Sequence, residues 1–421
     1  MKRTKFLGIV LTVVALVTTA CGGSSSKKSA TGSTKSSSSA APTPIKLGFL
    51  VEQSGPVAVV GTVAIPAMQL AVKKVNDAGG FTVAGKKYTF DLDIKDNKSD
   101  ASASAAAATG MVDDDGVKFI FGPTTSDTSP GVAQIVLPKG VLMFSPGTAL
   151  QTMLTPDKLT TSSETLFRTN WSPEGIGAEG GAALRKAFPN AKTIAFVMSD
   201  SGSSKATAPV TKAAAIKEGF TVVDEETVPA TATDFQTVLT KVKAKNPDVI
   251  FTGSETAVDT GVIKQAVDLG ITAGIAYSNQ PVAIPLKTAI GKPVPIKTLV
   301  VGQPAVLENS PSGTLLAAPP TLSSFANDLK TQVGKDVGPG QAIGFYYYDF
   351  VALLAKAMQS AGTVTDTKAI SKALASGVSV DGALGSVAFT KGHVTNTPAG
   401  ICVTEASSGT PTCSLLPPPG I

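Results

Sequence analysis

Hydroxyl-bearing residues and glycines follow several short apolar runs of the sequence. They are Ser54 and Gly55 after the run 45–51, Thr125 and Ser126 after 117–122, and Gly147 and Thr148 after 141–145. The hydroxyl groups of Ser126 and Thr148 can donate to a carboxylate, and Gly147 allows a ligand to approach the backbone closely. The competing interpretation is ordinary turn chemistry, because turns use Ser, Gly and Thr in any case.

Catalytic side chains are scarce. His393 is the single histidine and lies in a Lys-Gly-His turn, without a nucleophile arranged around it. No zinc-ligand spacing and no Gly-rich phosphate loop of the Walker type occurs. The acidic run 113–115 precedes a glycine, which favours a solvated turn over a metal site. We therefore expect neither an enzyme nor a protein that holds a cofactor or a metal ion.

The N-terminus has the layout of a secretory signal. Basic residues at 2, 3 and 5 precede the apolar run Phe6 to Val17, and small residues then lead to Cys21. Such a run is too short to span a membrane as a mature helix. The cysteine directly after the small residues predicts a signal peptide over 1–20 and a lipidated Cys21. The alternative is an ordinary signal peptide followed by a bystander cysteine.

The segment 21–44 predicts a flexible tether, because it contains Gly, Ser, Thr and Ala and no large apolar residue. Residues 1–44 contain six basic and no acidic residues, so the 36 basic and 31 acidic residues of the chain leave 30 and 31 for residues 45–421. A body that is near neutral lacks the basic footprint of a nucleic-acid-binding protein. Binding to nucleic acid is therefore not expected.

Cys402 and Cys413 are the remaining cysteines after Cys21. In an oxidising compartment outside the cytoplasm, they are expected to form a disulfide that closes a small C-terminal loop. Two free thiols are the alternative.

Strand and helix patterns alternate from Ile45 to Tyr277, with an irregular stretch over 148–175. Strands that alternate with helices predict a parallel sheet covered by helices on both faces, and two such runs predict two sheets. The expected fold is α/β with two Rossmann-like lobes. Lobe 1 is expected to span 45–167 and 281–395, and lobe 2 to span 168–280 and 396–421. The aromatic residues 345–350 are expected to be core rather than a binding box.

The body resembles the type I periplasmic-binding proteins of the branched-chain amino acid class, which serve ABC importers. The resemblance rests on motifs in order, namely IKLGFLVEQSGP (45–56), AMQLAVKKVNDAGG (67–80), FGPTTS (121–126), VLMFSPGTA (141–149), FRTN (167–170) and VPATATDFQTVLTKVKAKNPDVIFTG (228–253). It implies two lobes joined by a three-strand hinge and a solute held between them.

The resemblance also implies the residues that contact the solute. They are Ser54, Gly55, Thr125, Ser126, Gly147 and Thr148 from lobe 1, and Ser203, Ser254 and Asn279 from lobe 2. Trp171 and Tyr277 are candidates for an aromatic wall. Trp171 packing at the lobe junction is an equal alternative.

Several of these positions depart from the pattern of the amino-acid binders. Val60, Ser203 and Ser254 stand where those proteins have aromatic residues, and Asn279 stands near their acidic residue. Burying an ammonium group without a carboxylate is costly, so a free branched-chain amino acid is not the expected solute.

The expected function is that of an extracytoplasmic solute-binding lipoprotein, monomeric and anchored to the cell membrane by its N-terminal lipid. It would deliver a small polar or carboxylate-bearing solute to the permease and ATPase subunits of an ABC importer by hinge closure. The alternative is a sensory receptor that signals to a membrane kinase.

Overall fold

The structure is a computed structural model of the whole chain. It describes residues 41–154, 163–170, 173–278, 290–291, 294–302, 320–334, 344–383, 385–395, 399–406 and 411–416. The signal peptide, Cys21 and most of the expected tether lie outside these ranges.

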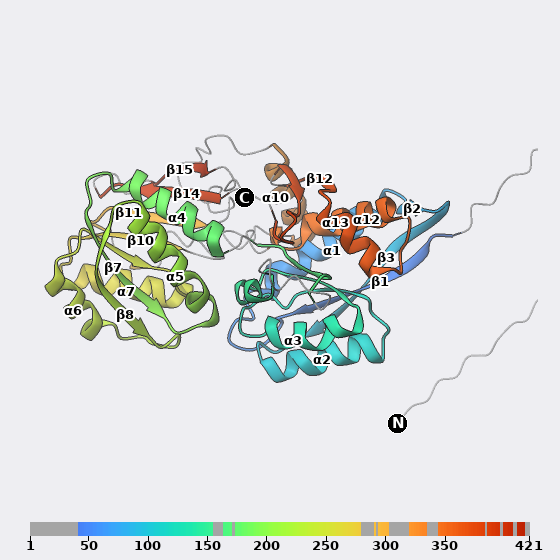
Figure 1. The fold of residues 1–421 in the computed structure, drawn as a ribbon, viewed down its shortest axis with the longest axis horizontal. Coiled ribbons are helices and arrows are strands. Elements are labelled where there is room, and N and C mark those ends of the chain that lie inside the picture. The colour runs from blue at the N-terminus through green and yellow to red at the C-terminus, as the bar shows by residue number, and fades with distance from the viewer. Residues whose placement is uncertain are drawn as a thin grey trace, which may run out of the picture. The chain divides into compact units, whose positions relative to one another are not determined.

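A six-stranded sheet organises the first lobe (Figure 1). In spatial order its strands are β2 (Phe81–Val83), β3 (Lys86–Asp96), β1 (Thr43–Val51), β4 (Phe119–Phe121), β5 (Leu142–Ser145) and β6 (Leu166–Arg168). All neighbours are parallel except β2 and β3. Parallel strands need crossover connections. These include the helices α1 (Gly61–Asp77), α2 (Ala101–Asp113) and α3 (Ser129–Val136) and the 3₁₀ helices η1 (Leu137–Lys139) and η2 (Thr148–Met153).

Three helices from late in the chain complete this lobe. They are α10 (Pro320–Val333), α12 (Tyr348–Ala361) and α13 (Thr367–Ala375), and the hairpin of β12 (Ser379–Gly382) and β13 (Gly385–Ala388) follows them. Apolar residues of all three helices belong to the same buried cluster as residues of β1 and α1.

A seven-stranded sheet organises the second lobe. In spatial order its strands are β15 (Pro411–Leu416), β14 (Ala399–Thr404), β11 (Thr298–Gly302), β10 (Gly274–Ser278), β9 (Val249–Thr252), β7 (Thr193–Ser199) and β8 (Thr221–Val228). Its helices are α4 (Pro173–Ala187), α5 (Gly202–Lys217), α6 (Gln236–Lys245) and α7 (Thr256–Asp268). Strands β7 to β11 pair in parallel, and β14 and β15 add an antiparallel edge.

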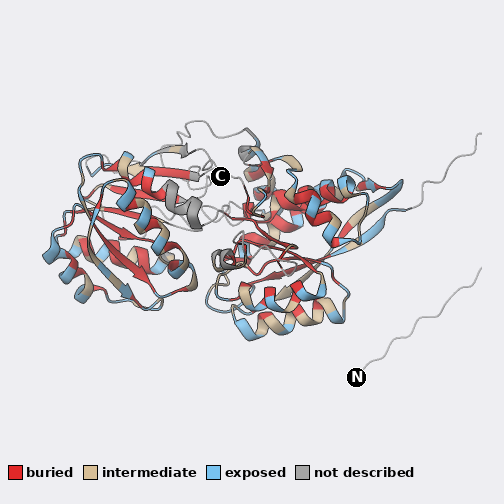
Figure 2. Ribbon diagram, in the orientation of Figure 1, coloured by how far each residue is buried: buried red, intermediate tan, exposed pale blue. Residues whose placement is uncertain are grey.

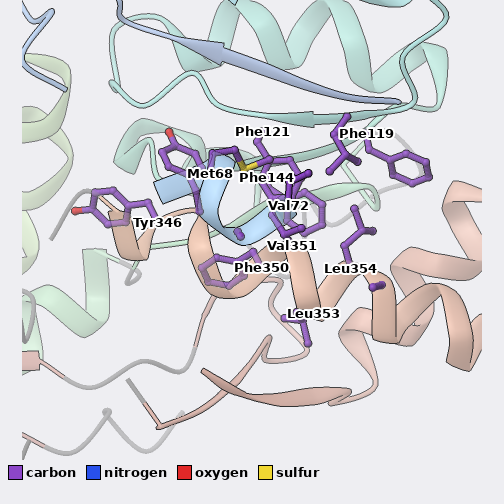
Figure 3. Close-up of a cluster of buried hydrophobic side chains, with 14 of the residues drawn as sticks. Met68, Val72, Phe119, Phe121, Phe144, Tyr346, Phe350, Val351, Leu353 and Leu354 are labelled. Carbon is purple, nitrogen blue, oxygen red and sulfur yellow. The ribbon is translucent and has the colours of Figure 1, made fainter. Parts of the chain in front are cut away.

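Buried residues concentrate in the strands and on the inner faces of the helices (Figure 2). In the first lobe, the rings of Phe121 and Phe144 stack at 4.6 Å between centroids, and Phe350 of α12 lies in the same cluster (Figure 3). Tyr346 and Tyr347 are also buried in it, so the interpretation of the aromatic run as core is confirmed.

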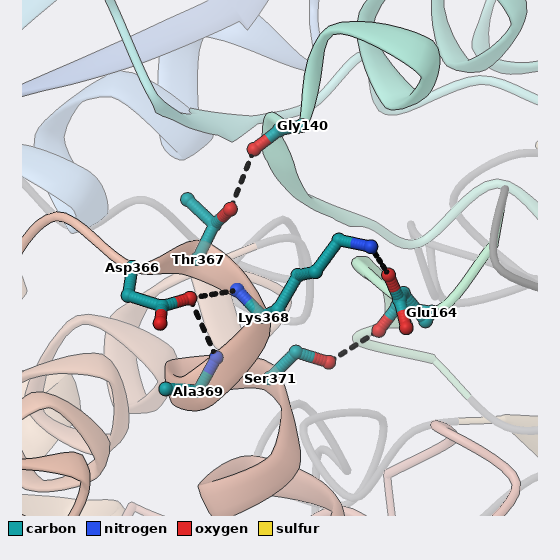
Figure 4. Close-up of polar contacts among 7 residues, drawn as sticks. All are labelled: Gly140, Glu164, Asp366, Thr367, Lys368, Ala369 and Ser371. Carbon is teal, nitrogen blue, oxygen red and sulfur yellow. Dashed lines mark hydrogen bonds and ion pairs between the residues drawn. The ribbon is translucent and has the colours of Figure 1, made fainter.

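Helix α13 is tied to the segment that leads into β6 (Figure 4). Asp366 caps the helix by accepting two backbone hydrogen bonds from its first turn. Lys368 forms an ion pair with Glu164 at 2.6 Å, and the hydroxyl of Thr367 donates to the carbonyl of Gly140 at 2.7 Å. The sequence analysis did not predict this helix.

One expected boundary is wrong. The sequence assigned 281–395 to lobe 1, but β11 (Thr298–Gly302) pairs with β10 on one side and β14 on the other, both in the second sheet. The run TLVVG is apolar throughout, as buried strands of either sheet are, so its composition does not reveal its sheet. The chain enters lobe 1 again only after β11, since α10 packs in the first core.

Candidate functional site

A buried glutamate joins three loops at the carboxyl ends of the strands in the first lobe. Glu52 follows β1 directly and is fully buried. Its Oε1 accepts hydrogen bonds from Asn97 Nδ2 at 3.0 Å and from the backbone N–H groups of Thr124 at 3.2 Å and Thr125 at 3.3 Å. Its Oε2 is buried without a hydrogen-bond partner. Sequence reasoning missed Glu52, although an acid directly after a buried strand is a usable signal.

Ser54 and Gly55 belong to a turn that Asp96 organises. The hydroxyl of Ser54 donates to Asp96 Oδ2 at 2.6 Å, and its N–H donates to Oδ1 at 3.1 Å. Burial opposes ionisation of Asp96, but these bonds and the N–H of Lys98 outweigh it and lower the pKa of the carboxyl. Gly55 has φ of +87°, and a Cβ there would lie 2.2 Å from the carbonyl oxygen of Lys98. Turn chemistry thus accounts for both residues.

Thr125, Ser126 and Gly147 lie close together at the ends of β4 and β5. The hydroxyl of Ser126 accepts a hydrogen bond from the N–H of Ala149 at 3.3 Å, which links the two loops. A Cβ at Gly147 would come within 2.3 Å of Ser129 Oγ, so the loop can take this path only with glycine. Thr148 begins η2; its side chain is outside the described part.

In the second lobe, Ser254 lies two residues after the end of β9. Its hydroxyl accepts from the N–H of Ser199 at 2.8 Å, and its own N–H donates to Asp259 Oδ1 at 3.0 Å. The hydroxyl of Thr252 donates to the same oxygen at 2.7 Å. Asp259 is 2% exposed, and its Oδ2 has no hydrogen-bond partner. Burial raises the pKa of Asp259 to about 7, although the bonds from Thr252 and Ser254 oppose that rise.

The other second-lobe candidates differ in exposure. Tyr277 is 7% exposed in β10, and burial raises the pKa of its phenol, with the nearby charge of Asp259 as a smaller cause. Ser203 is exposed at the start of α5. Next to it, the N–H of Gly202 donates to Asp127 Oδ1 at 3.2 Å. Trp171 and Asn279 lie outside the described residues.

The segment that leaves β6 pairs with a segment far along the chain. The N–H of Arg168 donates to the carbonyl of His393 at 2.8 Å, and the N–H of Thr395 donates to the carbonyl of Arg168 at 3.1 Å. Arg168 is fully buried, and the His393 ring stacks on Phe167 at 4.2 Å. Burial lowers the pKa of His393. Two of the chain segments expected in the hinge therefore run side by side.

A cavity of about 410 Å³ lies over β7 and β8, against α5. Its lining includes Phe196, Met198 and Ile216 but none of the predicted site residues.

In the part of the chain that the structure describes, no group of three or more His, Cys, Asp or Glu residues is placed to hold a metal ion. Asp113, from the acidic run, instead pairs with Lys139 at 2.7 Å. Over the same residues, no helix combines the length and the apolar character that a membrane span requires.

The sequence matches the family model described as "Periplasmic binding protein" over residues 44–409. The chain belongs to the periplasmic binding protein family. The match covers the strands of both sheets except β15.

Curated relatives are similar over most of their length. A protein named Leu/Ile/Val-binding protein homolog 3, from Brucella melitensis, is 26% identical over 352 residues, which is 84% of this chain and 89% of the relative. A Leu/Ile/Val-binding protein from Rhizobium johnstonii is 27% identical over 350 residues, 82% of this chain and 87% of the relative.

Solved structures share the fold of this periplasmic binding protein. A leucine-binding protein from Thermotoga maritima has a TM-score of 0.73 at 19% identity and covers 90% of this chain and 100% of its own. A solute-binding protein of an ABC transporter from R. palustris, in complex with 4-hydroxybenzoate, has a TM-score of 0.72 at 19% identity. The alignment covers 89% of this chain and 96% of that protein.

Positions where this periplasmic binding protein departs from the amino-acid binders have different environments. Val60 is 6% exposed and packs into the first core, so it does not take the place of an aromatic ligand contact. Ser254 has its hydroxyl engaged by a backbone N–H. Two buried acids near strand ends, Glu52 in the first lobe and Asp259 in the second, are at positions that the resemblance did not suggest.

Proposed function

We propose that this protein is an extracytoplasmic solute-binding lipoprotein that delivers a small polar or carboxylate-bearing solute to an ABC importer. Membership of the periplasmic binding protein family supports the binding role. The relatives named for leucine, isoleucine and valine, and the solved structure with 4-hydroxybenzoate, favour import of a small carboxylate-bearing solute over a sensory role.

The observation that carries this proposal is the set of polar groups at the carboxyl ends of strands in both lobes. Thr125, Ser126 and Gly147 gather at the ends of β4 and β5, and Ser254 lies at the end of β9. Ligands of open α/β sheets bind at this edge, where loops present hydroxyl and N–H groups. The N–H of Ala149, which donates to Ser126, could donate to a solute carboxylate instead. This change would cost little free energy, because one hydrogen bond replaces another.

Hinge closure is the proposed mechanism. The pairing of Arg168 with His393 and Thr395 joins two connecting segments by main-chain hydrogen bonds, which supports a hinge that bends as one unit. A solute that contacts both lobes shifts the population towards the closed form, which the permease would then recognise.

Anchoring through Cys21 belongs to the same proposal. The signal, the cysteine and the tether occur in this order in the sequence. A lipid on Cys21 would hold the body near the membrane, and the segment before β1 would let the body move. The expected tether over 21–44 is two residues too long, because Thr43 and Pro44 already pair with β3.

The proposal is tested by native mass spectrometry of the protein purified from its own host. We expect the protein to carry one small molecule, which partial denaturation releases. The identified solute should then bind again to the refolded protein. Ser126→Ala should weaken rebinding by roughly 1–3 kcal/mol, because the solute loses a hydrogen-bond partner. Thr240→Ala, on the exposed face of α6, is the matched control and should bind as the wild type does. If the solute binds at one molecule per protein and its affinity is unchanged by Ser126→Ala, the site lies elsewhere.

A further inference from the structure

A loop of the first lobe is held at its first residue, Thr124, by two buried side chains from distant parts of the chain. The backbone N–H of Thr124 donates to Glu52 Oε1 at 3.2 Å, and the hydroxyl of Thr124 forms a hydrogen bond of 2.7 Å with the phenol oxygen of Tyr347. Glu52 and Tyr347 are both fully buried. They lie 72 and 223 residues from Thr124 in the sequence, so two separate elements fix this end of the loop.

The loop that begins at Thr124 carries two of the candidate solute contacts, Thr125 and Ser126. The N–H of Thr125 donates to the same oxygen of Glu52 at 3.3 Å. The hydroxyl of Thr125 forms a hydrogen bond of 2.8 Å with that of Thr128, which directly precedes α3. Thr125 and Ser126 are only half-buried, so the loop runs outward from its buried anchors.

The two anchoring side chains are themselves held in place. The ring of Tyr347 packs edge-on against Phe49 of β1, with 4.8 Å between centroids. Glu52 Oε1 also accepts from Asn97 Nδ2 at 3.0 Å, and the N–H of Asn97 donates to the carbonyl of Val51 at 3.1 Å. Side chains that are packed and bonded in this way keep one position, so they determine where the loop lies.

The competing interpretation is that these bonds only satisfy polar groups that happen to be buried. The chemistry of Tyr347 argues against it. Phe345 and Phe350 fill core positions on either side of Tyr347 in the sequence, so packing does not require a hydroxyl there. Burying a hydroxyl is costly unless it is hydrogen-bonded, and the bond that this hydroxyl makes goes to the loop at Thr124.

We propose that Tyr347 and Glu52 are positioning residues that hold Thr125 and Ser126 in the conformation that binds the solute. This inference rests on the proposed function, and it adds that the first-lobe half of the site is formed before the solute arrives. A loop that is already in its bound conformation loses less conformational entropy on binding, so the affinity is higher than for a free loop. Both residues act through the loop and do not touch the solute.

The first experiment needs no solute and measures amide hydrogen exchange in the full-length protein. Tyr347→Phe keeps the ring against Phe49 and removes only the bond to Thr124. We expect the amides of 124–126 to exchange at least about threefold faster in this variant, because the loop opens more often. Exchange in β1 and α12 should be unchanged. If the amides of 124–126 exchange as in the wild type, the proposal is wrong.

Tyr88→Phe is the matched control for this experiment. It removes a phenol hydroxyl from a half-buried position of β3 in the same lobe. Tyr88 pairs with Thr43 at the start of β1, whereas Glu52 follows the end of that strand. The control should leave exchange of 124–126 unchanged. Faster exchange in both variants would mean that any lost hydroxyl loosens the lobe, and this result would also count against positioning by Tyr347.

The second experiment measures, by calorimetry, the affinity for the compound that native mass spectrometry identifies. Tyr347→Phe should weaken binding about three- to tenfold, as expected for one lost hydrogen bond. The same change should have little effect when Ser126→Ala is already present, because Tyr347 acts through the loop that carries Ser126. Glu52→Gln keeps an acceptor oxygen and should therefore bind more tightly than Glu52→Ala.

The outcomes separate the positioning role from the proposed function. A loss of affinity in Ser126→Ala but not in Tyr347→Phe would overturn the positioning role and leave solute binding standing. Equal losses from Tyr347→Phe with and without Ser126→Ala would also overturn it, because a residue that acts only on the fold gives additive effects. If no compound binds, the proposed function fails, and hydrogen exchange still decides whether the two side chains hold the loop.

Discussion

Buried carboxylates with one unsatisfied oxygen occur at the ends of strands in both lobes. Glu52 follows β1, and Asp259 is bound to the last residue of β9. Each has its other oxygen engaged by backbone N–H groups, so each carboxylate holds a loop in place as well as contributing charge. The two loops thus positioned carry Thr125 and Ser254, which are candidate solute contacts. Acidic side chains therefore hold loops for which the sequence analysis named only hydroxyl groups and glycines as candidate contacts.

Asp259 makes the stability of the folded protein depend on pH. Its pKa is raised from 3.8 to about 7, so the folded state binds this proton more tightly than the unfolded chain does. Its contribution is fully present below pH 3.8 and is lost as the pH rises towards 7. The asparagine side chain of the variant Asp259→Asn cannot titrate. The free energy of unfolding of the variant, relative to that of the wild type, should therefore rise by roughly 2–4 kcal/mol between about pH 4 and pH 7. Urea unfolding at both pH values measures this gain, and Asp268→Asn should show none. An equal pH dependence for wild type and Asp259→Asn would mean that the aspartate is not protonated in the fold.

Helix α13 stabilises the first lobe, and the hairpin of β14 and β15 extends the sheet of the second lobe. The cap at Asp366 and the ion pair of Lys368 with Glu164 fix α13 against the strand that leads into the hinge (Figure 4). At the other end of the chain, β14 places Cys402 directly opposite Cys413 of β15. This register is the one that a disulfide between them needs, although the bond itself stays a prediction.

Asp366→Ala should destabilise the first lobe by about 1 kcal/mol, because two N–H groups of α13 lose their acceptor. Chemical unfolding measures the loss. Lys372→Ala, at an exposed position of the same helix, is the control and should change stability by less than about 0.5 kcal/mol. An unchanged midpoint for Asp366→Ala would show that another acceptor replaces the cap.

Cys402→Ser should lower the stability of exported protein by about 2–3 kcal/mol, the value expected for a short disulfide-closed loop. Thermal unfolding with and without reductant measures it, and the reductant should affect the wild type alone. Two free thiols in non-reduced peptide mapping would contradict the disulfide.

At the scale of the whole molecule, the chain passes between two sheets more than once. Arg168 ends the last strand of the first sheet, and its pairing with Thr395 brings a later crossing segment beside it. Strand β11 still belongs to the second sheet, and the chain contributes to the first core again with α10. This interleaving makes each lobe depend on sequence from both halves of the chain.

Cys21→Ser should release the protein into the soluble fraction, because the lipid is proposed to be its only attachment to the membrane. Fractionation of cells that express the variant measures this, with Ser24→Ala in the tether as the control. A variant that remains with the membrane, or a mature chain that starts elsewhere than Cys21, would refute the anchor.

Binding of leucine, isoleucine and valine should be weak or absent, because Val60, Ser203 and Ser254 provide no aromatic wall for a branched apolar side chain. Calorimetry on the purified protein measures this directly. Micromolar or tighter binding of leucine would refute this specificity.

The order of strands and helices was predictable from the sequence, because hydrophobic periodicity is local. The mostly apolar run over 298–302 forms β11, and Asp100, which directly precedes the alanine-rich run, caps α2. The resemblance to the family came from loop motifs such as SGP and FGPTTS, whose spacing reflects the same local alternation. What the sequence alone determined is therefore the class of fold and the loops that end its strands.

The tertiary structure decided which sheet each strand joins and which polar groups are already engaged. β11 was assigned to the wrong lobe because an apolar strand fits either sheet, and only its pairing with β10 and β14 distinguishes them. Ser54 was expected to contact a solute, but its hydroxyl is bound to Asp96, which lies 42 positions away in the chain. Glu52 and Asp259 were missed for the same physical reason. Burial and hydrogen bonding depend on neighbours distant in sequence, and these neighbours determine whether a carboxylate is a surface charge or part of a site.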